Sequence, residues 1–246
     1  MAPRLPRAPA LPGRRQGPRG LRGRSGRGSP VTLRLGVLVS GSGTNLQALL
    51  DATAQGRLDA EVRLVVSNRP DVFALERAAR AGVPSLVLNH REFGSREEFD
   101  GALVAALREA GVEWVALAGF MRVLTPVFLE AFAGRMVNIH PSLLPAFPGV
   151  DAQRQAFDYG VKVAGCTVHF VDGGVDTGPI IAQRAVPVLE EDDAASLRAR
   201  ILEQEHTLFV EALQAIAEGR VTTTSSPTGR TLVHVAPKSA PKREAR

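Results

Sequence analysis

Apolar positions along the chain alternate between two periodicities. Short apolar runs rich in Leu and Val cover residues 33–39, 62–66, 85–88, 114–118 and 136–139. Between these runs, apolar residues recur three or four positions apart, as in Leu46, Leu49 and Leu50, which is typical of an amphipathic helix. Strands that alternate with helices predict an α/β fold with a mostly parallel, Rossmann-like sheet and helices on both faces.

The pattern changes after Pro148. Two apolar runs, 166–171 and 180–188, are separated by a short Asp/Gly segment and predict an antiparallel hairpin. A long helix is predicted over 194–217, followed by a polar segment and a short strand at 231–235. We therefore expect one folded domain over 31–217, and over 218–246 a short strand segment and a basic tail.

The charge is unevenly distributed. The net charge of +5 suggests a nucleic-acid or membrane partner, but eight arginines lie within residues 1–30, which contain no acidic residue. The rest of the chain carries 22 basic and 25 acidic residues, a net of −3. Residues 1–30 are mostly Arg, Pro, Gly and Ala, too few of them apolar to fold, so we expect a disordered basic tail. It has no apolar segment typical of a secretory signal.

Cys166 is the single cysteine, which excludes an internal disulfide and any cysteine-based zinc site. One free cysteine agrees with a reducing cytoplasm. The sequence also lacks the run of about 18 apolar residues that a membrane span requires. We expect a cytoplasmic protein with no membrane partner, no bound metal and no specific nucleic-acid partner.

A glycine-rich segment, Ser40 to Asn45, lies between the first strand and the first helix. Glycines there allow backbone amides to approach an anion closely. The segment is not a dinucleotide fingerprint, because Leu46 occupies the third glycine position and no acidic residue ends the second strand. A single phosphomonoester is the ligand that it favours, and a tight turn without a ligand is the alternative.

The segment Asn138-Ile139-His140-Pro141 ends the fifth strand. Strand geometry places Asn138 and His140 on one face and Ile139 on the other. An amide and an imidazole at the carboxyl end of a parallel sheet can support acyl transfer, with Asn138 as oxyanion donor and His140 as proton carrier. The alternative is a loop cap and a buried structural histidine.

The loop from Asp172 to Pro179 contains three glycines, whose exposed amides could wrap a flat heterocycle while Asp176 orients the histidine. An ordinary hairpin turn is the local alternative. His169 lies on the preceding strand between Val168 and Phe170, and we expect it to be structural rather than the catalytic base.

Four segments together resemble the phosphoribosylglycinamide formyltransferase family of folate-dependent formyltransferases. They are residues 40–47 (Ser-Gly-Ser-Gly-Thr-Asn-Leu-Gln), 117–122 (Leu-Ala-Gly-Phe-Met-Arg), 138–145 (Asn-Ile-His-Pro-Ser-Leu-Leu-Pro) and 175–179 (Val-Asp-Thr-Gly-Pro). The last two are the specific ones. The similarity spans about residues 33–217, which the resemblance makes a catalytic domain.

The resemblance implies transfer of a formyl group from 10-formyltetrahydrofolate, the co-substrate, to the amine of 5-phosphoribosylglycinamide in purine (IMP) biosynthesis, by a monomer or homodimer. The implied catalytic residues are Asn138, His140 and Asp176. Those implied to bind the ribonucleotide are Gly43, Thr44, Asn45 and Glu205. The folate is assigned to Arg96, Met121, Arg122, Val123, Leu124, Asn138, Asp172, Gly173, Gly174, Val175 and Asp176.

Two positions depart from the family pattern. Residues 149–152 (Gly-Val-Asp-Ala) stand where the family often has a histidine, and Leu202 stands where some members have a polar ribonucleotide contact. Both departures concern the substrate side of the site.

Three other functions remain as alternatives. Formyltetrahydrofolate hydrolase shares the catalytic domain but is expected to carry a regulatory domain in front of it. Methionyl-tRNA formyltransferase is expected to carry an RNA-binding domain after it. A non-enzymatic nucleic-acid binder would depend on the tail arginines, and deleting the tail would abolish its binding.

Overall fold

The computed structural model describes residues 32–238, so the basic tail expected over 1–30 lies outside the described residues. Its main element is a seven-stranded sheet of order β3-β2-β1-β4-β5-β6-β7. Strands β1 to β5 pair in parallel, whereas β6 is antiparallel to both β5 and β7. The strands are β1 (Leu33–Val39), β2 (Ala60–Ser67), β3 (Ser85–Val87), β4 (Trp114–Leu117), β5 (Met136–His140), β6 (Val163–Phe170) and β7 (Ile180–Pro187).

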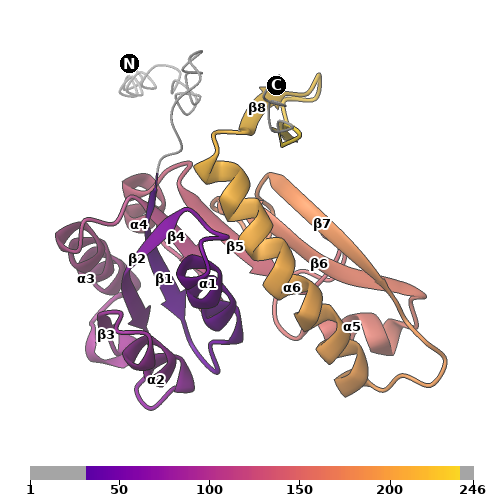
Figure 1. Cartoon of the computed structure of the whole chain (residues 1–246), viewed down its shortest axis with the longest axis horizontal. Coiled ribbons are helices and arrows are strands. Elements are labelled where there is room, and N and C mark those ends of the chain that lie inside the picture. The colour runs from indigo at the N-terminus through magenta and orange to yellow at the C-terminus, as the bar shows by residue number, and fades with distance from the viewer. Residues whose placement is uncertain (1–31, 239–246) are drawn as a thin grey trace, which may run out of the picture.

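Helices cover both faces of the sheet, as predicted, because side chains alternate along each buried strand. Leu35 and Val37 of β1 pack into one apolar cluster with α1, α2 and α6, and Leu38 packs into a second with α3 and α4. Helix α6 crosses the sheet obliquely, with α5 against it (Figure 1). The helices are α1 (Thr44–Ala54), α2 (Phe73–Arg80), α3 (Arg96–Glu109), α4 (Pro126–Ala131), α5 (Ala152–Tyr159) and α6 (Ala194–Ala217), with a 3-10 turn at His90–Glu92.

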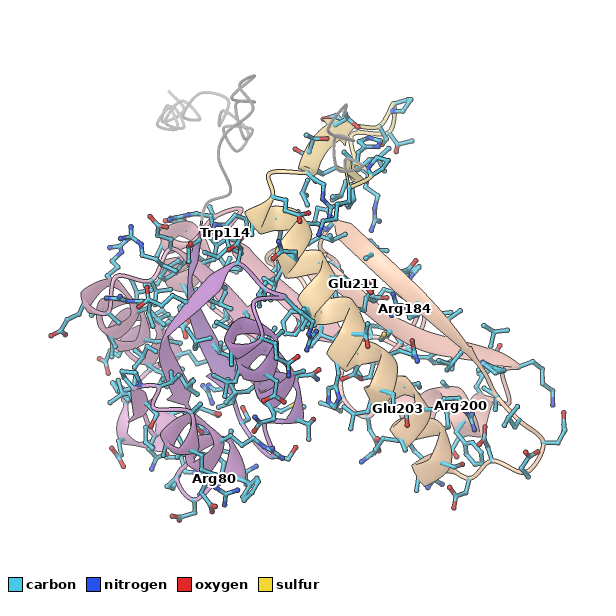
Figure 2. All side chains as sticks on the ribbon, viewed as in Figure 1. Arg80, Trp114, Arg184, Arg200, Glu203 and Glu211 are labelled. Carbon is cyan, nitrogen blue, oxygen red and sulfur yellow. The ribbon has the colours of Figure 1, made fainter. Side chains whose placement is uncertain are left out.

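Local capping explains why α6 begins where it does. The Asp193 carboxylate accepts the N–H groups of Ala195 and Ser196, and the Ser196 hydroxyl accepts the N–H of Asp193. Further along, the Arg184 guanidinium of β7 lies beside the Glu211 carboxylate of α6 at 2.7 Å (Figure 2). The Arg184–Glu211 pair joins α6 to the antiparallel part of the sheet.

The strand and helix predictions hold for the long, strongly patterned elements, and the structure adds two elements that the pattern did not reveal. The short helix α5 was not predicted. The polar segment after α6 contains strand β8 (Val221–Ser225), which pairs with β9 (Thr231–Val235) as a separate hairpin beyond the end of α6 (Figure 1). Because β8 is Val-Thr-Thr-Thr-Ser, its β-branched threonines favour a strand that hydrophobicity alone misses.

The chain order places a ligand crevice at the centre of the sheet. From β1 the chain runs outward through β2 and β3, then crosses back to β4 on the other side of β1. Loops that leave β1 and β4 at their carboxyl ends therefore diverge, and open α/β sheets bind ligands at such a point. No helix within residues 32–238 is long and apolar enough to cross a membrane.

Candidate active site

A cavity of about 580 Å³ lies at this central crevice. The size suits a small-molecule ligand pair better than a single ion. All the residues that the sequence assigned to the site line it, except Arg96 and Gly173. Arg96 instead begins α3 and donates to the carbonyl of Val123 at 2.7 Å, which ties α3 to the segment Met121 to Leu124 in the cavity wall.

The loop after β1 forms one end of the cavity. Gly43 has a φ of 71° and is the N-cap residue of α1, so no side chain caps the first amides of that helix. The first turn of α1 also carries no acidic residue. A helix N-terminus with free amides, at the positive end of the helix dipole, can bind an anion. The N-terminus of α1 faces the cavity, which Gly41, Ser42 and Thr44 line.

A buried polar pair lies beside this loop. The Asn45 amide donates to the Glu205 carboxylate at 2.7 Å, and both side chains are buried. Burial raises the pKa of Glu205, and the hydrogen bond from the Asn45 amide offsets only part of this increase. One oxygen of each side chain, Asn45 Oδ1 and Glu205 Oε1, has no hydrogen-bond partner within the described residues. Both are acceptors, so the pair suits hydroxyl or amine donors of a ligand.

At the carboxyl end of β5, His140 lies between two acceptors. Its Nε2 is 2.9 Å from the carbonyl oxygen of Phe147, and its Nδ1 is 3.3 Å from Asp176 Oδ2. The same carboxylate oxygen accepts the N–H of Gly149 at 2.8 Å. The loop between Phe147 and Gly149 therefore positions the histidine and the aspartate together.

Asn138 completes the constellation through its cross-strand neighbour. Its Nδ2 lies 3.2 Å from His169 Nε2 and 3.4 Å from Asp176 Oδ1, and Asn138 pairs with His169 in the β5–β6 register. His169 Nδ1 lies 2.8 Å from the carbonyl oxygen of Phe170, which requires the proton on Nδ1 and leaves Nε2 to accept from Asn138. The contact to Asp176 is long for a hydrogen bond, so that amide proton remains available to a ligand.

Burial and charge act against each other at His140 and Asp176. Burial lowers the pKa of His140 below its usual value, although the Phe147 carbonyl and the Asp176 carboxylate raise it. Burial alone would raise the pKa of Asp176, but the adjacent His169 ring and the hydrogen bond from the Gly149 N–H outweigh burial and leave that pKa below its usual value. At neutral pH Asp176 is thus ionised and His140 is neutral in the free site, and the Asp176 carboxylate faces the ring nitrogen, Nδ1, that can take up a further proton.

The structure adds two observations about the side chains around Asp176. The carboxylate of Asp176 does favour a protonated His140, as its charge predicts, but burial of the ring has the larger effect. His169, which its apolar neighbours suggested was structural, contacts both Asn138 and Asp176. Sequence alone could not show this, because it depends on the antiparallel register of β5 and β6.

The two positions that depart from the family pattern both line the cavity. Asp151 has a φ of 54° and begins α5, and its carboxylate pairs with Arg198 of α6 at 2.7 Å. Leu202 lies one helical turn further along α6, between Arg198 and Glu205. An ion pair and an apolar side chain thus occupy this part of the wall.

We expect the histidines His140 and His206 to destabilise the folded state as the pH falls from about 7 to about 5. Burial lowers the pKa of both His140 and His206, so the unfolded chain takes up protons first. Above the ordinary histidine pKa the two rings are neutral in both states and do not lower the free energy of unfolding. Below that pKa the unfolded chain is protonated first, so the free energy of unfolding decreases. Urea unfolding midpoints at the two pH values measure this. His140→Gln and His206→Gln should each flatten the dependence, whereas a wild-type dependence in both folded variants would contradict the prediction.

Comparison with known proteins gives a consistent set of matches. The family model described as formyl transferase matches residues 33–213. Among solved structures, glycinamide ribonucleotide transformylase 1 from Symbiobacterium toebii is similar with a TM-score of 0.79 and 54% identity, over 83% of this chain and 94% of that one.

Curated relatives fall into two groups by length. The trifunctional purine biosynthetic protein adenosine-3 of Drosophila melanogaster is 54% identical over 189 residues, which are 76% of this chain but 14% of the fly protein. The phosphoribosylglycinamide formyltransferase of Escherichia coli strain K12 is 43% identical over 185 residues, covering 75% of this chain and 87% of that protein. The chain thus spans a small part of the trifunctional relatives and most of the bacterial one.

Proposed function

This chain belongs to the formyl transferase family, and on that premise we propose that it transfers a formyl group from 10-formyltetrahydrofolate to the amine of glycinamide ribonucleotide in purine biosynthesis. The products are formylglycinamide ribonucleotide and tetrahydrofolate. Relatives whose names state this activity support the proposal. Residues 31–217 form the catalytic domain in this proposal.

The ribonucleotide occupies the end of the cavity formed by the loop after β1. Its phosphate binds the free amides at Gly43, Thr44 and Asn45, where the α1 dipole favours an anion. Its hydroxyls donate to the unpartnered oxygens of Asn45 and Glu205, since a buried acceptor without a donor is costly. The folate occupies the opposite end, against the segment Met121 to Leu124 and the loop Asp172 to Asp176.

The reaction forms a bond between the substrate amine nitrogen and the formyl carbon, and breaks the bond from that carbon to N10 of the folate. Negative charge grows on the formyl oxygen in the tetrahedral intermediate, and the weakly held Nδ2 proton of Asn138 stabilises it. His140 accepts the proton that the attacking amine loses, because it is unprotonated at neutral pH. Asp176 stabilises the resulting imidazolium, and the proton then passes to the departing N10.

One observation carries the proposal: Asn138, His140 and Asp176 converge in the cavity that also contains an uncapped helix N-terminus. The catalytic groups alone would suit hydrolysis of the formyl folate equally well. An anion site beside them favours a phosphate-bearing acceptor over water. No group of three His, Cys, Asp or Glu side chains suited to a metal ion occurs among residues 32–238.

The full-length protein tests the proposal in a spectrophotometric assay of tetrahydrofolate release from 10-formyltetrahydrofolate. We expect release that depends on added glycinamide ribonucleotide, with one formylglycinamide ribonucleotide formed for each folate released. Folate release at an equal rate without the ribonucleotide, accompanied by free formate, would instead identify a hydrolase. No release under either condition would reject both.

A further inference from the structure

Arg77 of α2 lies behind the loop that receives the phosphate, on the side away from the cavity. It lines a separate groove between α1, α2 and α6, whereas Gly41, Ser42 and Gly43 line the cavity itself. Its Nε donates to the carbonyl of Ser42 at 2.9 Å. None of the residues that the sequence assigned to the site lies on α2. The contact therefore connects α2 to the loop of the proposed phosphate site.

The carbonyls of the loop are held on the α2 side at two consecutive peptides. The N–H of Ala74 donates to the carbonyl of Gly41 at 3.2 Å, next to the bond from Arg77 to Ser42. In a planar trans peptide the N–H points opposite to the C=O. Fixing these two carbonyls toward α2 therefore directs the N–H groups of Ser42 and Gly43 away from α2, where no acceptor within residues 32–238 takes them.

The Arg77 side chain is itself held in place by three contacts. Besides the bond to Ser42, its Nη1 donates to Gln47 Oε1 of α1 at 3.0 Å, and its guanidinium lies 4.7 Å from the centre of the Phe73 ring. A planar guanidinium can make these contacts at once, which an ammonium cannot. The positive charge is therefore fixed behind the loop and adds to the field of the α1 N-terminus.

We propose that Arg77 is a positioning residue for phosphate binding, which orients the Ser42 and Gly43 amides toward the cavity by holding the Ser42 carbonyl and Gln47. The inference rests on the proposed phosphate site. Arg77 touches no ligand in this arrangement. It acts on the affinity for the phosphate-bearing substrate and not on the chemical step, because the catalytic groups lie at the end of β5 and in the loop before β7.

Arg80 provides a matched control one turn along α2. Its guanidinium lies over the same Phe73 ring at 5.2 Å, but its charge pairs with Glu76 and its side chain points outward at the end of the helix, away from α6 (Figure 2). Arg80→Met removes the same charge and the same stacking contact as Arg77→Met without touching the loop. A difference between the two variants therefore reports the loop contact.

The experiment measures steady-state kinetics and the affinity for inorganic phosphate in the wild type, Arg77→Met, Arg77→Lys and Arg80→Met. Arg77→Met should raise KM for the ribonucleotide and Kd for phosphate about 10-fold, the cost of one charge-assisted hydrogen bond, with kcat and KM for the folate within about twofold of wild type. Arg77→Lys should lie between, and Arg80→Met should match wild type. Thermal unfolding confirms that each variant is folded.

Equal constants in Arg77→Met and Arg80→Met, or a fall in kcat without a change in KM, would overturn the inference. If Arg77→Met does not fold, Gln47→Leu removes one anchor of the guanidinium and should raise the phosphate Kd by a smaller factor, and an unchanged Kd would overturn the inference. Phosphate binding is measured directly, so it tests Arg77 even if the ribonucleotide is not the substrate. A wild type that turns over the ribonucleotide but binds no phosphate would overturn this inference and leave the proposed function standing.

Discussion

Replacing Asp176 by Asn should lower turnover by roughly 10²- to 10⁴-fold, the range that a positioned acid–base group contributes. Asn keeps the size of the side chain and tolerates the left-handed backbone at this position, where φ is 54°. It removes the charge that would stabilise His140 once the ring accepts a proton. KM for both substrates should change little, since the role proposed for Asp176 is in the chemical step.

The hydrogen bonds around Asp176 explain why Asn is a poor replacement despite its shape. The carboxylate accepts the Gly149 N–H with Oδ2, and its Oδ1 makes a long contact of 3.4 Å with the Asn138 amide. An Asn side chain has one carbonyl oxygen, so one of these donors would face an NH₂ group. The variant thus disturbs the orientation of Asn138 together with the charge at His140.

A second readout separates this mechanism from a general loss of structure. The carboxylate of Asp176 is one of two contacts that raise the pKa of His140 against the effect of burial, so that pKa should fall further in Asp176→Asn. NMR titration of the ring measures it. The control is Asp158→Asn on α5, whose carboxylate forms an exposed pair with Arg154. Wild-type turnover with a wild-type His140 pKa in folded Asp176→Asn would refute the assignment.

The strands of the sheet could be predicted from sequence because hydrophobic runs in a parallel sheet are nearly continuous. Strand β1 and helix α6 have the predicted bounds, Leu33–Val39 and Ala194–Ala217. Helix α5 could not be predicted this way, because it buries only two small side chains fully, Ala152 and Ala156, and Phe157 only in part. A short helix with so little apolar surface leaves no periodic signal.

The residues proposed to be catalytic could also be named from the sequence, but their mutual geometry could not. Residue types and strand period placed Asn138 and His140 on one face of β5, and the family resemblance added Asp176. The contacts of His169 depend on antiparallel register, and those of Arg77 on how α2 packs against the loop after β1. Both arise between segments far apart in the chain, where local periodicity carries no information.

Gly43 shows how one residue connects the backbone conformation to the proposed phosphate site. Its φ of 71° is strained for any residue with a Cβ, and a Cβ built there would lie 2.6 Å from the Cβ and 2.8 Å from the Cα of Ala74. The Cα and Cβ of Ala74 are fixed by the backbone of α2, so rotating a side chain cannot relieve the clash. The loop must move away from α2, and its amides must move with it.

Gly43→Ala should therefore weaken ribonucleotide and phosphate affinity by roughly 10- to 100-fold. This factor corresponds to about 1–3 kcal/mol of backbone strain, which binding would require in the variant. Turnover at saturating substrate should fall much less, because Asn138, His140 and Asp176 lie on β5 and on the loop before β7. Gly101→Ala on α3 is the matched control, since a Cβ there meets nothing within 4 Å. Equilibrium binding of the ribonucleotide and of inorganic phosphate, with thermal unfolding of each variant, measures the effect. If folded Gly43→Ala binds both ligands as tightly as Gly101→Ala, the phosphate does not bind at this loop.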